Sequence, residues 1–261
     1  MNLQDEIASR IYRAPGVERQ YLSTALDTPE TMAFIKYQPC FAHRRVLDVG
    51  VGTGRTSRFL QPFAASYTCL DFSPPMVEYI RANLPWLDVH LADMRDLSEW
   101  RAASFDFILA SNNVLDAVSH EDRLLTLRGF HHVLDARGLL MFSSHNRRYR
   151  RALGGPRLHF SRNPVTQGRY AAQYMVQMAH HARTGRFRRF ENEYALLDDV
   201  GHDFQLLHYY IDRATQRRQL EQSGFTLLDV FDNDGMSLQD GDDDADSGTL
   251  LYVAQRSDDK S

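Results

Sequence analysis

The stretch Val46-Leu47-Asp48-Val49-Gly50-Val51-Gly52-Thr53-Gly54-Arg55 decides the fold of this 261-residue chain. Its first four residues are mostly apolar and predict a buried strand. Three alternating glycines follow, and then apolar residues at helical spacing, which predicts a tight turn that opens a helix. Glycine permits a sharp turn and a close approach of the backbone to a ligand, which a Cβ would block. The stretch therefore predicts the opening of a nucleotide-binding α/β unit.

The glycine spacing differs from the G-x-G-x-x-G of a pyrophosphate-binding turn. Asp48 lies inside the expected strand, where a carboxylate is costly to bury unless it accepts hydrogen bonds. The run D-V-G-V-G-T-G at 48–54 resembles the first motif of the class I methyltransferases that use S-adenosylmethionine (SAM). The resemblance extends over residues 40–146 and, more loosely, over 212–256. It implies SAM as the cofactor, with Asp48, Gly50, Gly52 and Gly54 at its binding site.

An acid ends the next expected strand, residues 67–71, about 20 residues beyond the glycines, where a ribose-binding carboxylate is expected. Two carboxylate oxygens can accept hydrogen bonds from both vicinal hydroxyls of a ribose, so Asp71 is the predicted ribose ligand. Ser73-Pro74 then begins a helix, and S-P-x-M resembles the second motif of the family. Phe72 and Met76 are candidates to sandwich the adenine, and Met76 fits equally well as a core side chain.

The third expected strand, residues 89–94, ends in Ala-Asp-Met, which resembles the family segment whose acid meets the adenine amino group. Asp93 is therefore expected to accept from that amine and the backbone of Met94 to donate to the ring. A helix cap or turn is the alternative role for Asp93. The fourth strand, 105–110, leads to Asn112, and the fifth, 139–143, leads to His145.

Five strands that alternate with helices imply an α/β fold with a doubly wound, mainly parallel sheet, whose ligands bind at the carboxyl ends of the strands. Two further strands at 227–231 and 249–254 resemble the antiparallel C-terminal hairpin of the family. We expect a seven-stranded Rossmann-like domain made of residues 41–146 and 212–256. Residues 147–211 would be a lid inserted between strands five and six. Residues 1–40 would be a helical segment over the cofactor site, with Tyr12 and Tyr21 as the residues of interest; a helix packed on the edge of the sheet is the alternative.

The formal net charge of −4 conceals an uneven distribution. Eleven arginines and no acid lie between Arg147 and Phe190, and seven aspartates and no basic residue lie between Asp232 and Asp246. Guanidinium groups without a counter-acid favour an anionic partner. The alternative is a solvated surface that the aspartates neutralise. The aspartate run lacks the order of an EF-hand, and two cysteines provide no disulfide framework or metal cluster, so no metal site is expected.

No apolar run approaches the ~20 residues of a membrane span, and the first residues lack the features of a signal peptide. We therefore expect a cytoplasmic protein that does not bind a membrane.

Methyl transfer from a sulfonium is an in-line displacement, so the protein must above all align the nucleophile. A neutral amine needs little more, whereas a hydroxyl needs a base or partial ionisation. The candidate catalytic side chains are His145, His208 and Tyr209, with Tyr210 as a further one. An amine is slightly favoured, because no acid lies within two residues of His145 to orient it as a base.

The sequence excludes several neighbouring activities. Residues 112–115 read Asn-Asn-Val-Leu rather than the N/D-P-P-Y/F of enzymes that methylate nucleobase amines, and Cys40 and Cys69 lie away from the position needed for C5 methylation. A dehydrogenase would need G-x-G-x-x-G. The prediction is thus a methyltransferase that acts on an N or O atom of a small molecule, with an anionic acceptor favoured by the arginines. The alternative is a methyltransferase or SAM-binding module that acts on RNA, protein or polysaccharide through the basic insertion.

Overall fold

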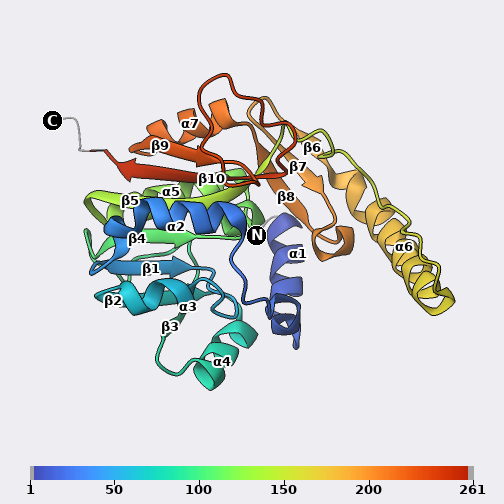
Figure 1. Ribbon diagram of the computed structural model, residues 1–261, viewed down its shortest axis with the longest axis horizontal. Helices are drawn as coiled ribbons and strands as arrows, with labels where there is room; N and C mark the ends of the chain where they lie inside the picture. Colours follow the sequence, from blue (N-terminus) through green and yellow to red (C-terminus); the bar gives the residue numbers. More distant parts are fainter. Residues whose placement is uncertain (1–2, 258–261) are drawn as a thin grey trace.

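A ten-stranded mixed sheet forms the centre of the protein; the computed structural model describes residues 3–257 (Figure 1). Strands β3, β2, β1, β4 and β5 are parallel neighbours in that order, and β10 then pairs antiparallel with both β5 and β9. The seven strands of this part are β1 (Arg45–Val49), β2 (Ser66–Asp71), β3 (Asp88–Leu91), β4 (Phe105–Ala110), β5 (Leu134–Asn146), β9 (Phe225–Phe231) and β10 (Thr249–Arg256). They confirm the predicted Rossmann-like fold and its antiparallel C-terminal hairpin.

Helices cover both faces of this sheet, because the side chains of each central strand alternate between two apolar layers. Leu47, Val49 and Ile108 pack into one core cluster, and Val46 and Phe107 into the other. The first cluster includes residues of α5 (His120–Val133) and α7 (Arg213–Gln222). The second includes residues of α2 (Thr28–Phe41), α3 (Ser57–Leu60) and α4 (Pro74–Asn83). None of the helices between residues 3 and 257 has the length and apolar character that crossing a membrane requires.

The insertion between β5 and α7 adds three strands to the sheet. They are β6 (Arg189–Phe190), β7 (Tyr194–Asp198) and β8 (Leu207–Ile211). The last two residues of β5, His145 and Asn146, pair in parallel with Tyr210 and Ile211 of β8. Because β10 occupies the other edge of β5, β8 takes the edge that β4 leaves free beyond Ala110. The insertion thereby reaches the carboxyl ends of the parallel strands.

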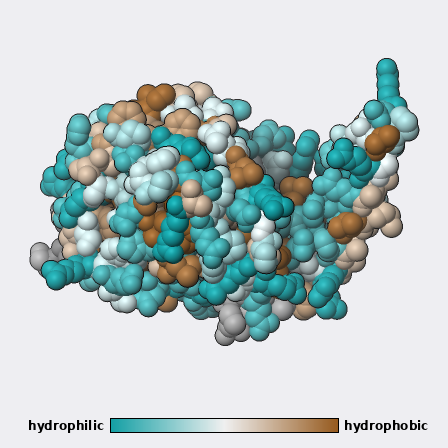
Figure 2. All heavy atoms as spheres, turned by 90° about the horizontal axis from the view of Figure 1, so that it is seen from below, coloured by the Kyte–Doolittle hydropathy of each residue, from teal (hydrophilic) through white to brown (hydrophobic). Residues whose placement is uncertain are grey.

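A long helix in the insertion projects from the body as an arm, α6 (Pro164–Thr184) (Figure 1). Asn163 caps its start, because its side-chain oxygen accepts from the backbone N–H groups of Val165 and Thr166. Hydrophobic side chains lie exposed along the arm, among them Val165, Met175 and Val176 (Figure 2). Residues 185–187 and 201–204 form the short helices η4 (Gly185–Phe187) and η5 (Gly201–Phe204).

The N-terminal segment runs past the carboxyl end of the sheet before β1. It contains α1 (Leu3–Tyr12) and the short helix η1 (Val17–Tyr21); two further short helices, η2 (Gln61–Phe63) and η3 (Val114–Ala117), follow β1 and β4. The main-chain oxygen of Tyr12 accepts from Ser73 Oγ at 2.6 Å, and that of Tyr21 accepts from the Thr53 hydroxyl. These bonds fix the segment to the turns that follow β1 and β2.

Candidate active site

The glycine turn after β1 contains three left-handed residues, of which Gly50 and Gly52 line the space at the strand ends. Gly50 has φ +66°, and a Cβ there would lie 2.6 Å from Cγ2 of Val114. Gly52 has φ +55° and no atom within 4 Å of a Cβ position, so its surface is open. Both conformations disfavour any residue with a Cβ. The turn thus presents bare backbone toward the space at the strand ends.

Asp48 meets the donors that its burial requires. It is 1% exposed, and its Oδ2 accepts from the hydroxyls of Tyr67 at 2.6 Å, Ser57 at 2.9 Å and Thr56 at 3.1 Å. Burial raises the pKa of this carboxyl, and the three hydroxyls oppose the rise. The side chain therefore anchors the turn to the following helix and to β2.

Asp71, at the end of β2, is held by backbone donors on both of its oxygens. Oδ2 accepts from Gly52 N and Oδ1 from Ser73 N, each at 2.9 Å. Burial raises the pKa of this carboxyl to about 6, against the opposing effect of the backbone N–H groups. Asp71 lines the same space as Gly52, and a carboxylate there can accept from the two hydroxyls of a ribose.

Asp93 forms an ion pair that the sequence did not indicate. Its two oxygens accept from Nε and Nη2 of Arg95 at 3.0 and 2.7 Å. Burial raises the pKa of Asp93, but the bonds from Arg95 outweigh it and the net pKa is lowered. Asp93 thus remains an ionised acceptor at the edge of the cavity. Arg13 lies with its guanidinium carbon 5.5 Å from the ring centroid of Phe72.

These residues surround one cavity of about 330 Å³ at the carboxyl ends of β1, β2, β3 and β4. Tyr12, Arg13 and Tyr21 of the N-terminal segment also line it. Nine of the ten predicted cofactor residues contribute to its wall: Asp48, Gly50, Gly52, Asp71, Phe72, Met76, Asp93, Met94 and Asn112. Gly54 does not line the cavity, because it faces the α4 side, where a Cβ would lie 2.5 Å from Leu84 Cδ1. The third glycine therefore permits close packing of the turn rather than contact with a ligand.

A second cavity, of about 810 Å³, opens beside the first and shares Tyr12, Tyr21 and Asn112 with it. His145, His208 and Tyr210 line it from the sheet. The insertion contributes Tyr149, Arg151, Arg157, His159, Tyr170, Tyr174 and Phe204. The space between the sheet edge and the arm thus adjoins the space over the glycine turn.

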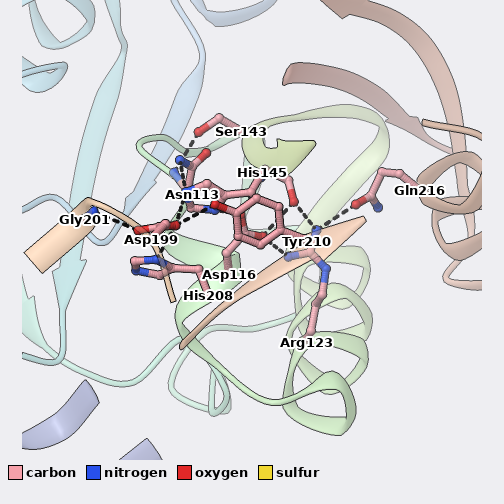
Figure 3. Close-up of polar contacts among 11 residues, drawn as sticks. Asn113, Asp116, Arg123, Ser143, His145, Asp199, Gly201, His208, Tyr210 and Gln216 are labelled. Carbon is pink, nitrogen blue, oxygen red and sulfur yellow. Dashed lines mark hydrogen bonds and ion pairs between the residues drawn. The ribbon is translucent and has the colours of Figure 1, made fainter. Parts of the chain in front are cut away.

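A buried carboxylate orients His145 at the floor of the second cavity (Figure 3). Oδ2 of Asp116 lies 2.7 Å from Nδ1 of His145 and also accepts from the His145 backbone N–H. Its Oδ1 accepts from Arg123 Nη1 at 2.6 Å and from Ser144 Oγ at 2.7 Å. Asp116 and Arg123 are both 0% exposed. Burial raises the pKa of Asp116, but Arg123 and His145 outweigh it and lower the net pKa, so the buried pair is ionised.

A second acid, Asp199, lies on the other side of His145. Its Oδ2 accepts from Tyr210 Oη at 2.7 Å and lies 2.9 Å from His208 Nδ1, while Oδ1 accepts from Gly201 N at 2.8 Å. Burial opposes ionisation of Asp199, but His208 holds the pKa of that carboxyl well below its usual range, and Asp199 raises the pKa of His208. His145 Nε2 is 3.6 Å from Asp199 Oδ2, and the two imidazole rings stack with centroids 5.0 Å apart.

Residues 46–138 match a family model described as a methyltransferase domain. The matched segment contains the glycine turn, Asp71, Asp93 and Asn112, which together form much of the first cavity. This protein is a class I SAM-dependent methyltransferase. Its cofactor is SAM, and the first cavity fits it, with an open turn beside Gly52 and an acid with free lone pairs at the end of β2.

Solved structures with the same fold include three methyltransferases. One is the Burkholderia thailandensis 1,6-didemethyltoxoflavin-N1-methyltransferase, with bound 1,6-didemethyltoxoflavin and S-adenosylhomocysteine (15% identity, TM-score 0.59, 98% of this chain and 88% of that chain). Another is the CcbJ methyltransferase from Streptomyces caelestis (18%, 0.59, 98% of both). The third is the magnesium protoporphyrin IX methyltransferase from Synechocystis PCC 6803 with bound SAM (14%, 0.58, 98% and 99%). A search of curated proteins found no match.

Tyr209 of the methyltransferase does not reach the second cavity. The side chains of β8 alternate, and that of Tyr209 is fully buried on the opposite side, where its Oη lies 2.8 Å from His120 Nδ1 and accepts from Gln219. Tyr210 takes the position in the cavity. The structure thus corrects the predicted candidate by one residue, from Tyr209 to Tyr210. The reason is the register of β8, which pairs Tyr210 with His145 of β5.

Sequence reasoning did not find Asp116 or Asp199. Asp116 lies in η3, 29 residues before His145 in the chain. Asp199 directly follows β7, 54 residues after His145. Neither acid belongs to a motif with a defined spacing. Only the pairing of β5 with β8 and the packing of η3 beneath them place both carboxylates on one histidine.

Proposed function

We propose that this methyltransferase transfers a methyl group to an N or O atom of a small molecule that binds in the second cavity. The observation that carries the proposal is that the two cavities share Tyr12, Tyr21 and Asn112. SAM supplies an electrophilic methyl group on a sulfonium sulfur. An acceptor that lies against Asn112 is next to the donor site, and alignment at such a junction is the main requirement of an in-line displacement.

In this proposal the residues of the first cavity contact different parts of SAM. Gly50 and Gly52 allow the cofactor to approach the backbone, and Asp71 accepts from its ribose hydroxyls. Phe72 and Met76 flank the adenine, Asp93 accepts from the adenine amino group, and the Met94 backbone N–H donates to the ring. Asp48 fixes the turn through its three hydroxyl donors, and Asn112 lies at the boundary with the acceptor.

Residues 147–211 act as a lid over the acceptor, and residues 1–40 cover the cofactor. Two contacts support this arrangement: Tyr21 Oη hydrogen-bonds to His202 Nε2, and the Tyr12 ring packs edge-on against His202 with centroids 5.1 Å apart. Burial lowers the pKa of His202 to about 4, so this imidazole is neutral at physiological pH. The N-terminal segment and the lid therefore meet above the junction of the two cavities.

His145, His208 and Tyr210 are the groups that we propose to act on the acceptor. All three line the second cavity, which shares Asn112 with the donor site. Asp116 orients His145 through Nδ1, which supplies the acid that the neighbouring sequence lacks. This removes the reason for favouring an amine over a hydroxyl acceptor, and both remain in the proposal.

An anionic group on the acceptor is expected to meet Arg151 and Arg157, which line the cavity from the lid. Other arginines of the insertion form ion pairs with the aspartate loop, residues 232–246. Arg148 Nε lies 3.5 Å from Asp244, and Arg150 lies 3.2 Å from Asp243. This partial neutralisation favours a small acceptor over a nucleic acid backbone. A cytoplasmic location remains a prediction.

The test is a methyl-transfer screen with isotopically labelled SAM. We expect label in small amines, phenols or alcohols that carry a carboxylate or phosphate, and mass spectrometry of the product identifies the methylated atom. RNA, a protein extract and a polysaccharide form the other arm of the screen. Labelling of a macromolecule alone would contradict the proposal and favour the alternative in which the basic insertion binds a polymer.

A further inference from the structure

We propose that the methyltransferase binds a divalent first-row transition-metal ion between His145, Asp199 and His208. One ligand atom from each of these side chains lies within 4.8 Å of the others. Two imidazole nitrogens and one carboxylate oxygen form the ligand set of many catalytic Zn²⁺ sites and non-haem Fe²⁺ sites. All three side chains line the second cavity, so an ion between them would have an open side toward the acceptor. Figure 3 shows the contacts that join Asp199 to His145 and His208.

His145 is prepared to be a ligand by its hydrogen bonds. Asp116 Oδ2 lies 2.7 Å from Nδ1, and a proton on Nδ1 that donates to this carboxylate leaves Nε2 as the nitrogen available to a metal ion. Nε2 lies on the side of Asp199, 3.6 Å from its Oδ2. A carboxylate behind a ligating histidine is the usual arrangement in metal sites, because it fixes the ring and its tautomer. Arg123 and Ser144 in turn fix Asp116.

The carboxylate oxygen of Asp199 lies from the nitrogens of His208 and His145 at nearly the distances expected between two ligands of one metal ion. Two ligand atoms about 2.1 Å from one ion in tetrahedral geometry lie roughly 3.4 Å apart. His208 Nδ1 is 2.9 Å and His145 Nε2 is 3.6 Å from the same carboxylate oxygen of Asp199. Small side-chain shifts thus bring all three atoms to bonding distance. Tyr210 and Gly201 keep the carboxylate in place through both of its oxygens.

Asn113 offers an independent sign that this place lacks a partner. Its Oδ1 is buried and, among the described residues, has no hydrogen-bond partner, while its Nδ2 lies 3.3 Å from His145 Nε2. The two ends of an amide are nearly alike in shape, so a half-turn of the side chain directs Oδ1 into the site as a fourth ligand.

The mixed nitrogen and oxygen ligands select among metals. Zn²⁺, Fe²⁺ and Mn²⁺ accept such a set, whereas Mg²⁺ and Ca²⁺ prefer oxygen ligands alone. One consequence rests on the proposed function: an acceptor hydroxyl or carboxylate would bind the open side of the ion, next to the donor site. His145 and His208 would then act on the acceptor through the metal. The sequence alone predicted no metal site, because its ligands lie far apart in the chain.

The experiment is calorimetry of the full-length protein, first freed of metal with a chelator and then titrated with Zn²⁺. We expect one site per chain with a micromolar or lower dissociation constant. Asp199→Asn and His208→Asn should weaken binding at least 100-fold, and Asp116→Asn about 10- to 100-fold through its effect on His145. His132→Asn is the matched control, because His132 is an exposed histidine of α5 and should leave binding unchanged. Mg²⁺ should not compete.

Two further readouts keep the test decisive. S-adenosylhomocysteine affinity, measured on each variant, shows whether the fold is intact, and Co²⁺ added to the native protein should produce the visible bands of a nitrogen- and oxygen-ligated ion. Absence of a one-to-one Zn²⁺ site, or equal binding in Asp199→Asn, His208→Asn and the control, would overturn the proposal. Failure of the small-molecule screen would instead overturn the proposed function, since the Zn²⁺ titration uses no acceptor.

Discussion

The two adjoining cavities of this methyltransferase are built in different ways. The first is formed mainly by residues that directly follow β1, β2, β3 and β4, and its acids accept from backbone N–H groups and side chains that lie at most 19 residues away in the chain. The second combines η3, β5, the insertion and β8, and its floor is a network of charged side chains. Local turns are thus enough for the cofactor site, whereas the acceptor site depends on long-range pairing.

The largest effect is expected when the arm is removed. Gly155 and Gly185 both approach His181, at 3.4 and 3.6 Å from a Cβ position, so a short flexible linker can replace residues 156–184. The arm carries several residues that line only the second cavity. Methyl transfer should be lost, whereas S-adenosylhomocysteine affinity should change by less than about tenfold, or roughly 1.4 kcal/mol. Retained transfer to the same acceptor would show that the insertion is not a lid.

We expect substitutions in the buried Asp116–Arg123 pair beneath the second cavity to lower the free energy of unfolding more than substitutions in the first cavity. Arg123→Met leaves Asp116 as a buried charge without its main partner, so we expect a loss of roughly 3–5 kcal/mol in the free energy of unfolding. Denaturant unfolding measures it. Arg128→Met is the matched control, because Arg128 is an exposed residue of the same helix, and should change stability by less than about 0.5 kcal/mol. Equal effects of the two substitutions would contradict an ionised buried pair.

In the cofactor cavity, removal of one acid should affect binding more than folding. Asp71→Ala should weaken S-adenosylhomocysteine by roughly 1.5–3 kcal/mol, the usual range for hydrogen bonds to a charged group. Calorimetry measures this loss. Asp88→Ala is the control, because Asp88 is an exposed acid near the start of β3 and lies outside both cavities. Unchanged affinity in Asp71→Ala would refute the assignment of this residue to the ribose.

The pKa of Asp71 also predicts a pH dependence of cofactor binding. The free protein titrates this carboxyl at about 6, because burial disfavours its charge. Ribose hydroxyls donate to the ionised form, so binding lowers the pKa, and affinity should be full above pH 6. Affinity should then decrease as pH falls through 6, by at most about tenfold per pH unit for one proton. Asp71→Asn should abolish this dependence; an unchanged profile would assign the titration to another group.

The smallest effect concerns the surface of the insertion. Since Arg148 and Arg150 already contact the aspartate loop, the methyltransferase should bind heparin weakly and with a shallow salt dependence. A steep decrease of affinity with salt would indicate many phosphate-like contacts and favour a polymeric acceptor. Substitution of Asp243 and Asp244 by asparagine should increase heparin affinity, because it frees these arginines.

The residues around the first cavity could be predicted from short-range patterns in the sequence. Strand ends, glycines and acids follow one another at short intervals, and in a parallel sheet the carboxyl ends of neighbouring strands meet at one edge. Asp48, Asp71, Asp93 and Asn112 could therefore be assigned to one cavity, which the structure contains. Of the ten predicted cofactor residues, only Gly54 lies outside this cavity. It packs against Leu84 instead, and the glycine pattern alone does not distinguish a packing glycine from a binding one.

The residues around the second cavity, in contrast, are brought together by long-range packing. Whether Tyr209 or Tyr210 faces the cavity depends on strand register, and a shift of one residue reverses the face. Asp116 and Asp199 meet His145 only because β8 pairs with the last residues of β5 and η3 packs against both strands. No short-range pattern encodes such a meeting, because it joins segments that are far apart in the chain and are brought together by the packing of the whole domain.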